Sequence, residues 1–380
     1  MRARFLLLLV LLLSALVLLA GCEDGEVVRT VDDPLPDAGV FVSDTLDYPQ
    51  VFTADTSPGG DVFLLGTTLF GASPAENYGL NVLRISPYGE TLFETDGEDF
   101  IASDIHATVD YGCVGSGTPT PLKYNSEGGV DWLLDIPATS TLPRPDGSVI
   151  LAGHEGVEDT LIHVTAVNAL GVTLWSTSFE REPHELAVGA ARIPNGDTAL
   201  LLQTLSNDDP ISPIPITGVR IISADGSTQQ TRTIADPEFV SLVQTFVALA
   251  DGGFAAFGVL EVEGALIQNI MCVWDASGAI AWQYTNSELE YSRHDIEPAS
   301  DNGLLLLTQE LSAAPIRLRR FDAAGNIIWT REYGETFPHQ GAIPLDVAIL
   351  DDNLIQLSYY MTTASLTKGQ VVIVREEMEP

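Results

Sequence analysis

The segment FDAAGNIIW, residues 321–329, is one copy of a sequence motif that recurs along the chain. The motif consists of an apolar strand, a turn glycine and an aromatic residue four positions after the glycine. Six copies align on the glycine, and Gln230 replaces the aromatic residue in one of them. The six pairs are Gly89 and Phe93, Gly128 and Trp132, Gly171 and Trp175, Gly226 and Gln230, Gly278 and Trp282, and Gly325 and Trp329. Six copies are too many for chance, so the chain is built from repeats.

A second recurring unit lies between these copies, a turn followed by an apolar run, and it occurs seven times. The segment RPDGSVILAG at residues 144–153 is one example. Asp-Gly and Asn-Gly between apolar runs indicate hairpins, because glycine accepts the positive φ of a tight turn. One period of roughly 40 to 55 residues therefore holds four strands, which is typical of a β-propeller blade.

These counts predict an all-β fold, a seven-bladed β-propeller of four-stranded antiparallel blades. The last repeat supplies only three strands, at residues 345–350, 354–360 and 370–375. We expect the unassigned segment GVFVSDTL, residues 39–46, to pair beside residues 370–375 as the outermost strand and close the ring. The recurring tryptophans are expected to pack between adjacent blades.

Residues 250–288 and 321–335 resemble the repeats of secreted bacterial propeller proteins similar to the quinoprotein (PQQ-like) and delta-60 repeat families. The resemblance covers roughly residues 40–376 and rests on structural motifs, so what it implies is the fold. The chain has no recognisable cofactor-stacking or calcium-ligand constellation of the kind that a quinoprotein dehydrogenase needs. We therefore expect no cofactor.

The N-terminus resembles a bacterial lipoprotein signal. Arg2 and Arg4 precede an apolar run, and the segment LAGC at residues 19–22 ends it with small residues. The run is shorter than the roughly 20 residues that cross a bilayer. The resemblance implies a signal peptide at residues 1–21, a lipid on Cys22, an acidic tether at residues 22–38 and a propeller domain at residues 39–380. The expected location is the bacterial cell envelope, lipid-anchored outside the cytoplasm, periplasmic or surface-exposed.

Composition limits the partners. The chain has 17 Lys and Arg against 53 Asp and Glu, a formal net charge of -36, so nucleic acids and anionic surfaces are repelled. This acidity fits both a high-salt habitat and drift in an Arg-preferring genome. Cys113 and Cys272 lie far apart in strand-like sequence, and we expect buried free thiols rather than a disulfide.

The sequence contains none of four common catalytic or cofactor-binding motifs. These are the phosphate-binding loop GxxxxGK[ST], the dinucleotide-binding motif GxGxxG, the zinc-protease motif HExxH and the α/β-hydrolase motif GxSxG. The nearest candidate for a metal site is the segment GHEGVEDTLIH at residues 153–163. Imidazoles and carboxylates on one loop suit zinc or a similar ion, although carboxylates are common throughout this chain. The residues of this weak metal candidate are His154, Glu155, Glu158, Asp159 and His163.

Residues at the start of several innermost strands form a second candidate site, since in a propeller these segments surround one mouth of the central channel. Histidine, arginine and tyrosine at a concave mouth suit a sugar, a carboxylate or a peptide end. Histidines satisfied by neighbouring carboxylates are the ordinary alternative. The candidate binding residues are Arg181, His184, Glu185, Tyr291, Arg293, His294 and His339.

Two functions fit these observations. The favoured one is a monomeric, lipid-anchored binding or scaffolding protein with a protein, peptide or glycan ligand, because the repeats are structural and no catalytic motif is present. The alternative is a propeller enzyme with its site at the channel mouth, either a quinoprotein-like dehydrogenase or a carbohydrate-active hydrolase or lyase. A pair of carboxylates at the separation used by glycosidases would favour the hydrolase.

Overall fold

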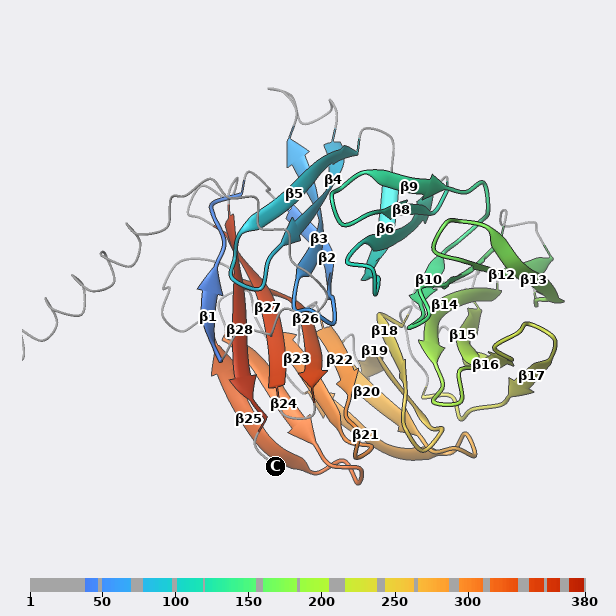
Figure 1. Cartoon of the computed structure of the whole chain (residues 1–380). Coiled ribbons are helices and arrows are strands. Elements are labelled where there is room, and N and C mark those ends of the chain that lie inside the picture. The colour runs from blue at the N-terminus through green and yellow to red at the C-terminus, as the bar shows by residue number, and fades with distance from the viewer. Residues whose placement is uncertain are drawn as a thin grey trace, which may run out of the picture. The chain divides into compact units, whose positions relative to one another are not determined.

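Seven four-stranded antiparallel sheets form a ring in the computed structural model (Figure 1). The structure describes residues 38–46, 50–69, 78–97, 101–118, 120–154, 160–182, 185–204, 216–237, 243–262, 266–286, 294–309, 315–333, 342–351, 354–362 and 369–378. No helix occurs within these ranges. The predicted all-β, seven-bladed propeller is confirmed.

Blades 1 to 6 each contain four consecutive strands, and blade 7 combines the last three strands of the chain with the first. Blade 1 is β2 (Gln50–Thr56), β3 (Val62–Leu69), β4 (Tyr78–Ile85) and β5 (Thr91–Gly97); blade 2 is β6 (Ile101–Ala107), β7 (Cys113–Thr118), β8 (Leu122–Tyr124) and β9 (Val130–Leu133). Blade 3 is β10 (Ser140–Pro143), β11 (Val149–Gly153), β12 (Leu161–Val167) and β13 (Thr173–Glu180); blade 4 is β14 (Glu185–Arg192), β15 (Thr198–Thr204), β16 (Ile216–Ile222) and β17 (Gln229–Arg232). Blade 5 is β18 (Thr245–Ala248), β19 (Phe254–Val262), β20 (Leu266–Trp274) and β21 (Ile280–Asn286); blade 6 is β22 (His294–Pro298), β23 (Leu304–Gln309), β24 (Ile316–Phe321) and β25 (Ile327–Tyr333). Blade 7 is β26 (Ala342–Asp351), β27 (Leu354–Thr362), β28 (Gly369–Glu377) and β1 (Gly39–Val42).

The first strand of each blade lies at the centre of the ring. β2, β6, β10, β14, β18, β22 and β26 each contact their counterparts in the two neighbouring blades, and β26 contacts β2. In blade 7, β1 pairs antiparallel with β28, with Val40 opposite Val374 and Val42 opposite Val372 (Figure 1). Blade 7 thus takes its outermost strand from the beginning of the chain. How much that strand stabilises the ring stays a prediction.

The geometry of the outer hairpins explains the Asp-x-x-Gly sequence of their turns, which is Asp322 to Gly325 in the last copy. In FDAAGNIIW, Gly325 has a φ of 83° and donates its N–H to the Asp322 carbonyl at 3.0 Å. The Asp322 carboxylate accepts the N–H groups of Ala324 and Asn326 at 2.9 and 2.8 Å. The strand register shifts just before this turn, so the glycine occupies the left-handed position of a bulged hairpin.

The same glycines also receive the aromatic residue of the preceding blade. A Cβ on Gly325 would lie 2.6 Å from the Trp282 ring, and the Trp282 Nε1–H donates to the Ala323 carbonyl at 3.1 Å. Trp132 makes this contact with Gly171 and Ala169, and Trp175 makes it with Gly226 and Ala224. We call this arrangement the indole clamp. The expected packing of tryptophans between blades is confirmed at these three positions.

Other blade boundaries, or seams, depart from the clamp. Gly278 is covered by the backbone of Thr233 and Ile234 rather than by a side chain of β17, where Gln230 stands. On β1, the Phe41 ring contacts the Tyr88 ring of blade 1 edge-on, with centroids 5.8 Å apart. The Trp329 Nε1–H is buried and has no hydrogen-bond partner among the described residues. Blade 7 offers it no outer hairpin, because its fourth strand is β1.

The core is divided among the seams. Each of the seven buried hydrophobic clusters lies between two neighbouring blades. Cys113 belongs to the cluster between blades 1 and 2, and Cys272 to the one between blades 4 and 5. Both are free and buried, as expected, and burial raises the pKa of Cys272 to about 12. These thiols therefore serve packing.

Candidate functional site

Arg181 and Glu185, two of the predicted mouth residues, lie where β13 ends and β14 begins. Their exposed fractions are 8% and 5%. The Arg181 guanidinium donates to the Glu185 carbonyl at 2.7 Å, and the Glu185 carboxylate accepts the Thr217 hydroxyl and the Glu182 N–H. In this structure the two side chains hold the connection between blades 3 and 4.

Most of the remaining mouth residues fall outside the part of the chain that the structure describes. The backbone of His294 begins β22 and pairs with Thr308. His184, Tyr291, Arg293 and His339 lie outside the described residues. A site made by these residues stays a prediction.

The candidate metal residues are described in part. His163 on β12 pairs with Gly153, the last residue of β11, so His154 and His163 lie at the same end of one hairpin. Glu155, Glu158 and Asp159 fall outside the described residues. Within the described part of the chain, no group of three His, Cys, Asp or Glu side chains is placed to hold a metal ion. Cys22 and its lipid likewise lie outside that part.

The central channel contains a cavity of about 490 Å³, lined by residues from all seven innermost strands or from positions next to them. Its wall has two chemically different halves. Blades 6, 7, 1 and 2 contribute four carboxyl groups and one imidazole: Asp295, Asp346, Asp55, Asp104 and His106. Blades 3, 4 and 5 contribute hydroxyl, amide, small and aromatic side chains, including Thr139, Gln244, Thr245 and Phe246. We call these the acidic half and the neutral half.

His106 is held between two carboxylates on the acidic half. Its Nε2 lies 2.8 Å from Asp104 Oδ2, and its Nδ1 lies 3.6 Å from Asp55 Oδ2. The side chains of His106, Asp55 and Asp104 keep 30%, 31% and 40% of their surface exposed. Asp55 also accepts the N–H of Ala107 from the next blade at 2.6 Å. This group therefore joins blades 1 and 2 while remaining open to the channel.

Charge pairing sets the protonation of this group. Burial lowers the pKa of His106, but the carboxylates of Asp104 and Asp55 outweigh it and raise that pKa well above its usual value. Burial raises the pKa of Asp104, but the charge and hydrogen bond of His106 outweigh it and lower that pKa. The imidazolium form is thus favoured between the carboxylates.

Asp295 and Asp346 form a second group, which spans three blades. Asp295 on β22 and Asp346 on β26 both line the cavity. Asp295 also accepts the Val347 N–H of β26 at 2.9 Å, and Asp346 accepts the Thr56 hydroxyl of blade 1. These two bonds cross the seam between blades 6 and 7 and the seam between blades 7 and 1.

The surroundings raise the pKa values of the carboxyl groups on this wall. Burial, followed by the charges of Asp295 and Asp55, raises the pKa of Asp346 well above its usual value. Burial also raises the pKa of Asp295 to about 6. The pKa of Glu297, two residues after Asp295 on β22, is raised well above its usual value by burial and by the charges of Asp295 and Asp55. Like charges confined to one wall cannot all ionise together.

Backbone bulges precede several of these side chains. The strand register shifts just before Thr53 on β2, Asp104 on β6 and Asp346 on β26. An extra residue in one strand re-aims the side chain that follows it. The mouth hypothesis, which concerned the starts of strands, did not include Asp55, Asp104 or Asp346.

None of the described segments is a helix with the length and apolar character needed for a membrane span. No protein-family model and no curated protein matches the chain.

Solved structures do resemble the fold. The propeller of Dos1 aligns with a TM-score of 0.51 at 10% identity, over 90% of this chain and 88% of that one. A protein of unknown function from Dyadobacter fermentans DSM 18053 has a TM-score of 0.49 at 14% identity, over 89% and 98%. The β-propeller domain of the Trilobed protease from Pyrococcus furiosus has a TM-score of 0.48 at 9% identity, over 91% and 97%. At 10% identity the likeness to the Dos1 propeller shows the fold alone.

Proposed function

We propose that this protein is a ligand-binding propeller of the bacterial cell envelope, anchored by a lipid on Cys22, with the central channel as its binding site. The observation that carries the proposal is the channel cavity with an acidic and a neutral half. Concave sites with a few convergent polar groups are where proteins bind small molecules. The lipobox-like LAGC segment supports the anchor, since the propeller lies wholly downstream of it.

The lining indicates the chemistry of the ligand. The carboxylates of Asp55 and Asp104 accept hydrogen bonds and repel anions, while the neutral half adds hydroxyl groups and the Phe246 ring. A small molecule rich in N–H or O–H donors, such as a short glycan or the amino end of a peptide, satisfies both halves. Anionic ligands are disfavoured.

A binding screen tests the site. Titration calorimetry of the Cys22→Ser chain from residue 22 with short glycans and with amine-bearing peptides should find binding in one arm. Asp55→Asn together with Asp104→Asn should weaken it at least tenfold, a loss of about 1.4 kcal/mol. The matched control is Glu90→Gln, an exposed acid on an outer turn. Equal affinity in the channel variant and the control would contradict the proposal.

The anchor has its own test. Cells grown with labelled palmitate should show the label on the wild-type chain, and Cys22→Ser should remove the label and release the protein from the membrane fraction. A label that persists on the serine variant would show that another residue carries the lipid.

The enzymatic alternative has one observation in its favour, two carboxyl groups with raised pKa values in one cavity, as in acid–base catalysis. Glycosidases, however, hold their two carboxyl groups roughly 5 to 9.5 Å apart to make room for the sugar and water. Asp295 accepts the N–H of Val347, the residue after Asp346, and Asp346 accepts the Thr56 hydroxyl, so both carboxyl groups are already engaged within the protein. We therefore rank binding first, and chromatography of the screened glycans after incubation would reveal any cleavage.

A further inference from the structure

The lining of the channel carries more acidic than basic groups. The acidic half has four carboxyl groups and one imidazole, and the lining residues that the structure describes include no Lys or Arg. His106 is therefore the one basic side chain among them. A wall with this charge balance attracts a small cation more strongly than a neutral molecule.

His106 occupies a position that another cation can take. Its Nε2 lies 2.8 Å from Asp104 Oδ2, whereas its Nδ1 lies 3.6 Å from Asp55 Oδ2, so the second contact is the looser one. The imidazole and both carboxylates are partly exposed, and all three line the cavity. A ligand in the channel can therefore reach both carboxylates.

The backbone holds the two carboxylates in place independently of the imidazole between them. Asp55 accepts the N–H groups of Thr56 at 3.0 Å and of Ala107 at 2.6 Å. Asp104 accepts the N–H of Ile105 at 2.9 Å. Carboxylates fixed in this way are preorganised for a ligand, since little ordering is needed when it binds.

A side chain of the neutral half also indicates a ligand. Thr141 on β10 lines the cavity with an exposed fraction of 1%, and its Oγ1 has no hydrogen-bond partner among the described residues. β10 lies next to β6, the strand that carries Asp104 and His106. Buried hydroxyl groups in proteins are normally hydrogen-bonded. Thr141 is therefore suited to a polar group a few bonds away from a cation held by the two carboxylates.

We propose that the channel binds a primary ammonium group between Asp55 and Asp104, and that this group replaces the charge of His106, so that the imidazole releases one proton to the solvent as the ligand enters. The inference rests on the proposed function of the channel. An ammonium group is a compact charge with three N–H donors, enough for both carboxylates. The ligand brings one positive charge and the proton removes one. Amino sugars and the amino ends of peptides share this chemistry.

Few titratable groups face His106 apart from the two carboxylates. β6 is in contact with β2, β3, β7 and β10. β2 supplies Asp55, and Asp104 stands on β6 itself. β7 supplies Cys113, a buried thiol whose pKa is raised by burial, so it is neutral. β3 and β10 contain no ionisable residue.

The direction of the pH effect follows from the charge of His106. Burial lowers its pKa, but the two carboxylates outweigh burial and raise that pKa well above its usual value, so the ligand-free channel holds the proton at neutral pH. Because the ligand must displace that proton, its affinity should rise with pH by up to about tenfold per unit until His106 is neutral. Asp295 and Asp346 also have raised pKa values, and a nearby cation favours loss of their protons as well. A variant of His106 separates the two sources.

Titration calorimetry of the Cys22→Ser chain from residue 22 tests the exchange, with Nα-acetyl-lysine methylamide as the probe. Its ammonium group has a pKa of about 10.4 and stays charged between pH 6 and pH 8. Comparing two buffers of different ionisation enthalpy measures the proton release, which should approach one per ligand at pH 7. The probe acetylated on its side-chain nitrogen should bind about tenfold more weakly or worse. Glucosamine and alanine amide, each beside its N-acetylated form, distinguish an amino sugar from the amino end of a peptide.

His106→Gln removes the competing proton and keeps an amide donor for Asp104. This variant should release no proton and should bind the lysine probe about tenfold more tightly than the wild type at pH 6, with the difference shrinking towards pH 8. The matched control is His163→Gln on β12, outside the cavity lining, which should behave as the wild type does.

Four outcomes would overturn the exchange while leaving the channel as a binding site: binding without proton release, equal release from His106→Gln, equal affinity for the charged and acetylated probes, or binding of neutral glycans alone. If His106→Gln does not fold, the proton count and the acetylated probe still decide on the wild type. Absence of binding by both amines and glycans would instead contradict the proposed function itself.

Discussion

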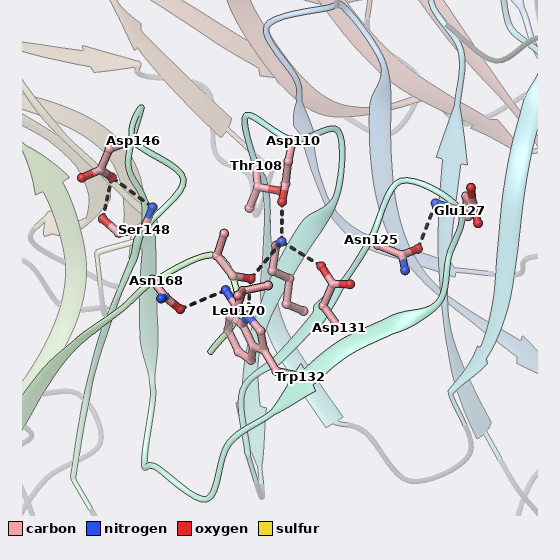
Figure 2. Close-up of polar contacts among 12 residues, drawn as sticks. Thr108, Asp110, Asn125, Glu127, Asp131, Trp132, Asp146, Ser148, Asn168 and Leu170 are labelled. Atoms are coloured by element: carbon pink, nitrogen blue, oxygen red, sulfur yellow. Dashed lines mark hydrogen bonds and ion pairs between the residues drawn. The ribbon is translucent and has the colours of Figure 1, made fainter. Parts of the chain in front are cut away.

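The seam between blades 2 and 3 and the seam between blades 6 and 7 are built from the same repeat but held differently. In the first, Trp132 donates to the Ala169 carbonyl at 3.2 Å (Figure 2). The Lys123 ammonium joins the same carbonyl at 3.4 Å and bonds Asp110 and Asp131, with only 1% of its side chain exposed. In the second seam, Trp329 has no such acceptor among the described residues.

The seam between blades 6 and 7 is held instead by partly exposed side chains that bond one carboxylate. The Arg331 guanidinium stacks 4.5 Å from the centroid of Trp329 and lies 2.7 Å from the Glu376 carboxylate. Tyr333 donates to the same carboxylate. The difference arises because the acceptor of the indole clamp is a hairpin carbonyl, and blade 7 borrows its fourth strand instead of forming that hairpin. Ring closure through β1 therefore changes the neighbouring seam.

The largest effect is expected from removing the borrowed strand. Deletion through Leu46 removes the pairing with β28 and the buried Ser43 and Leu46, so the free energy of unfolding should fall by several kcal/mol, a large share of the roughly 5–15 kcal/mol of a native protein. Deletion through residue 37 should be nearly silent. Urea unfolding of both truncations measures this, and equal midpoints would show that β1 does not secure the ring.

A middle-sized effect is expected from the cations of the two seams. Lys123→Met keeps the side-chain length but removes the buried ammonium, and should lower the free energy of unfolding by about 1–3 kcal/mol. Arg331→Met removes a cation that is 22% exposed, and should lower it by less than about 1 kcal/mol. Chemical denaturation measures the loss in free energy of unfolding for both variants. A larger loss for Arg331→Met than for Lys123→Met would contradict the expected order of the two seams.

The smallest effect isolates the indole hydrogen bond. Trp282→Phe removes the donor to the Ala323 carbonyl and should lower the free energy of unfolding by about 1 kcal/mol more than Trp329→Phe, which removes an unsatisfied donor. Circular dichroism during thermal unfolding is the suitable readout, because fluorescence changes with the tryptophan itself. Equal shifts in the two variants would mean that the Trp329 N–H is satisfied in solution.

Periodicity alone predicts much of this fold. The positions of Gly325 and Trp329 within one unit indicate a hairpin, and the seven inner units give the number of blades. What a single unit cannot show is that Gly325 receives Trp282 of the preceding blade rather than its own tryptophan. A repeat fixes spacing along the chain, whereas the partner of each side chain depends on how neighbouring units are rotated around the ring.

The channel residues were harder to find from the sequence. Asp55, Asp104 and Asp346 stand among 53 acidic residues, so their type gives no signal. The sequence also does not show where these side chains point. Side chains alternate between the two faces of a strand, so the face of a residue can be predicted only where the strand register is unbroken. The bulges before Asp104 and Asp346 interrupt that alternation. The raised pKa values of Asp295 and Asp346 depend on distances between blades, which no local pattern contains.

The pairing of the first and last strands in blade 7 makes the propeller suited to circular permutation. Gly39 lies opposite Arg375 just as Ile327 lies opposite Phe321 across the FDAAGNIIW turn. A linker spelled Asp-x-x-Gly between β28 and β1 would convert the borrowed strand into an ordinary outer hairpin, with new termini opened in another exposed turn. Such a rearranged gene would encode seven equivalent blades and give Trp329 the carbonyl that Trp282 already has.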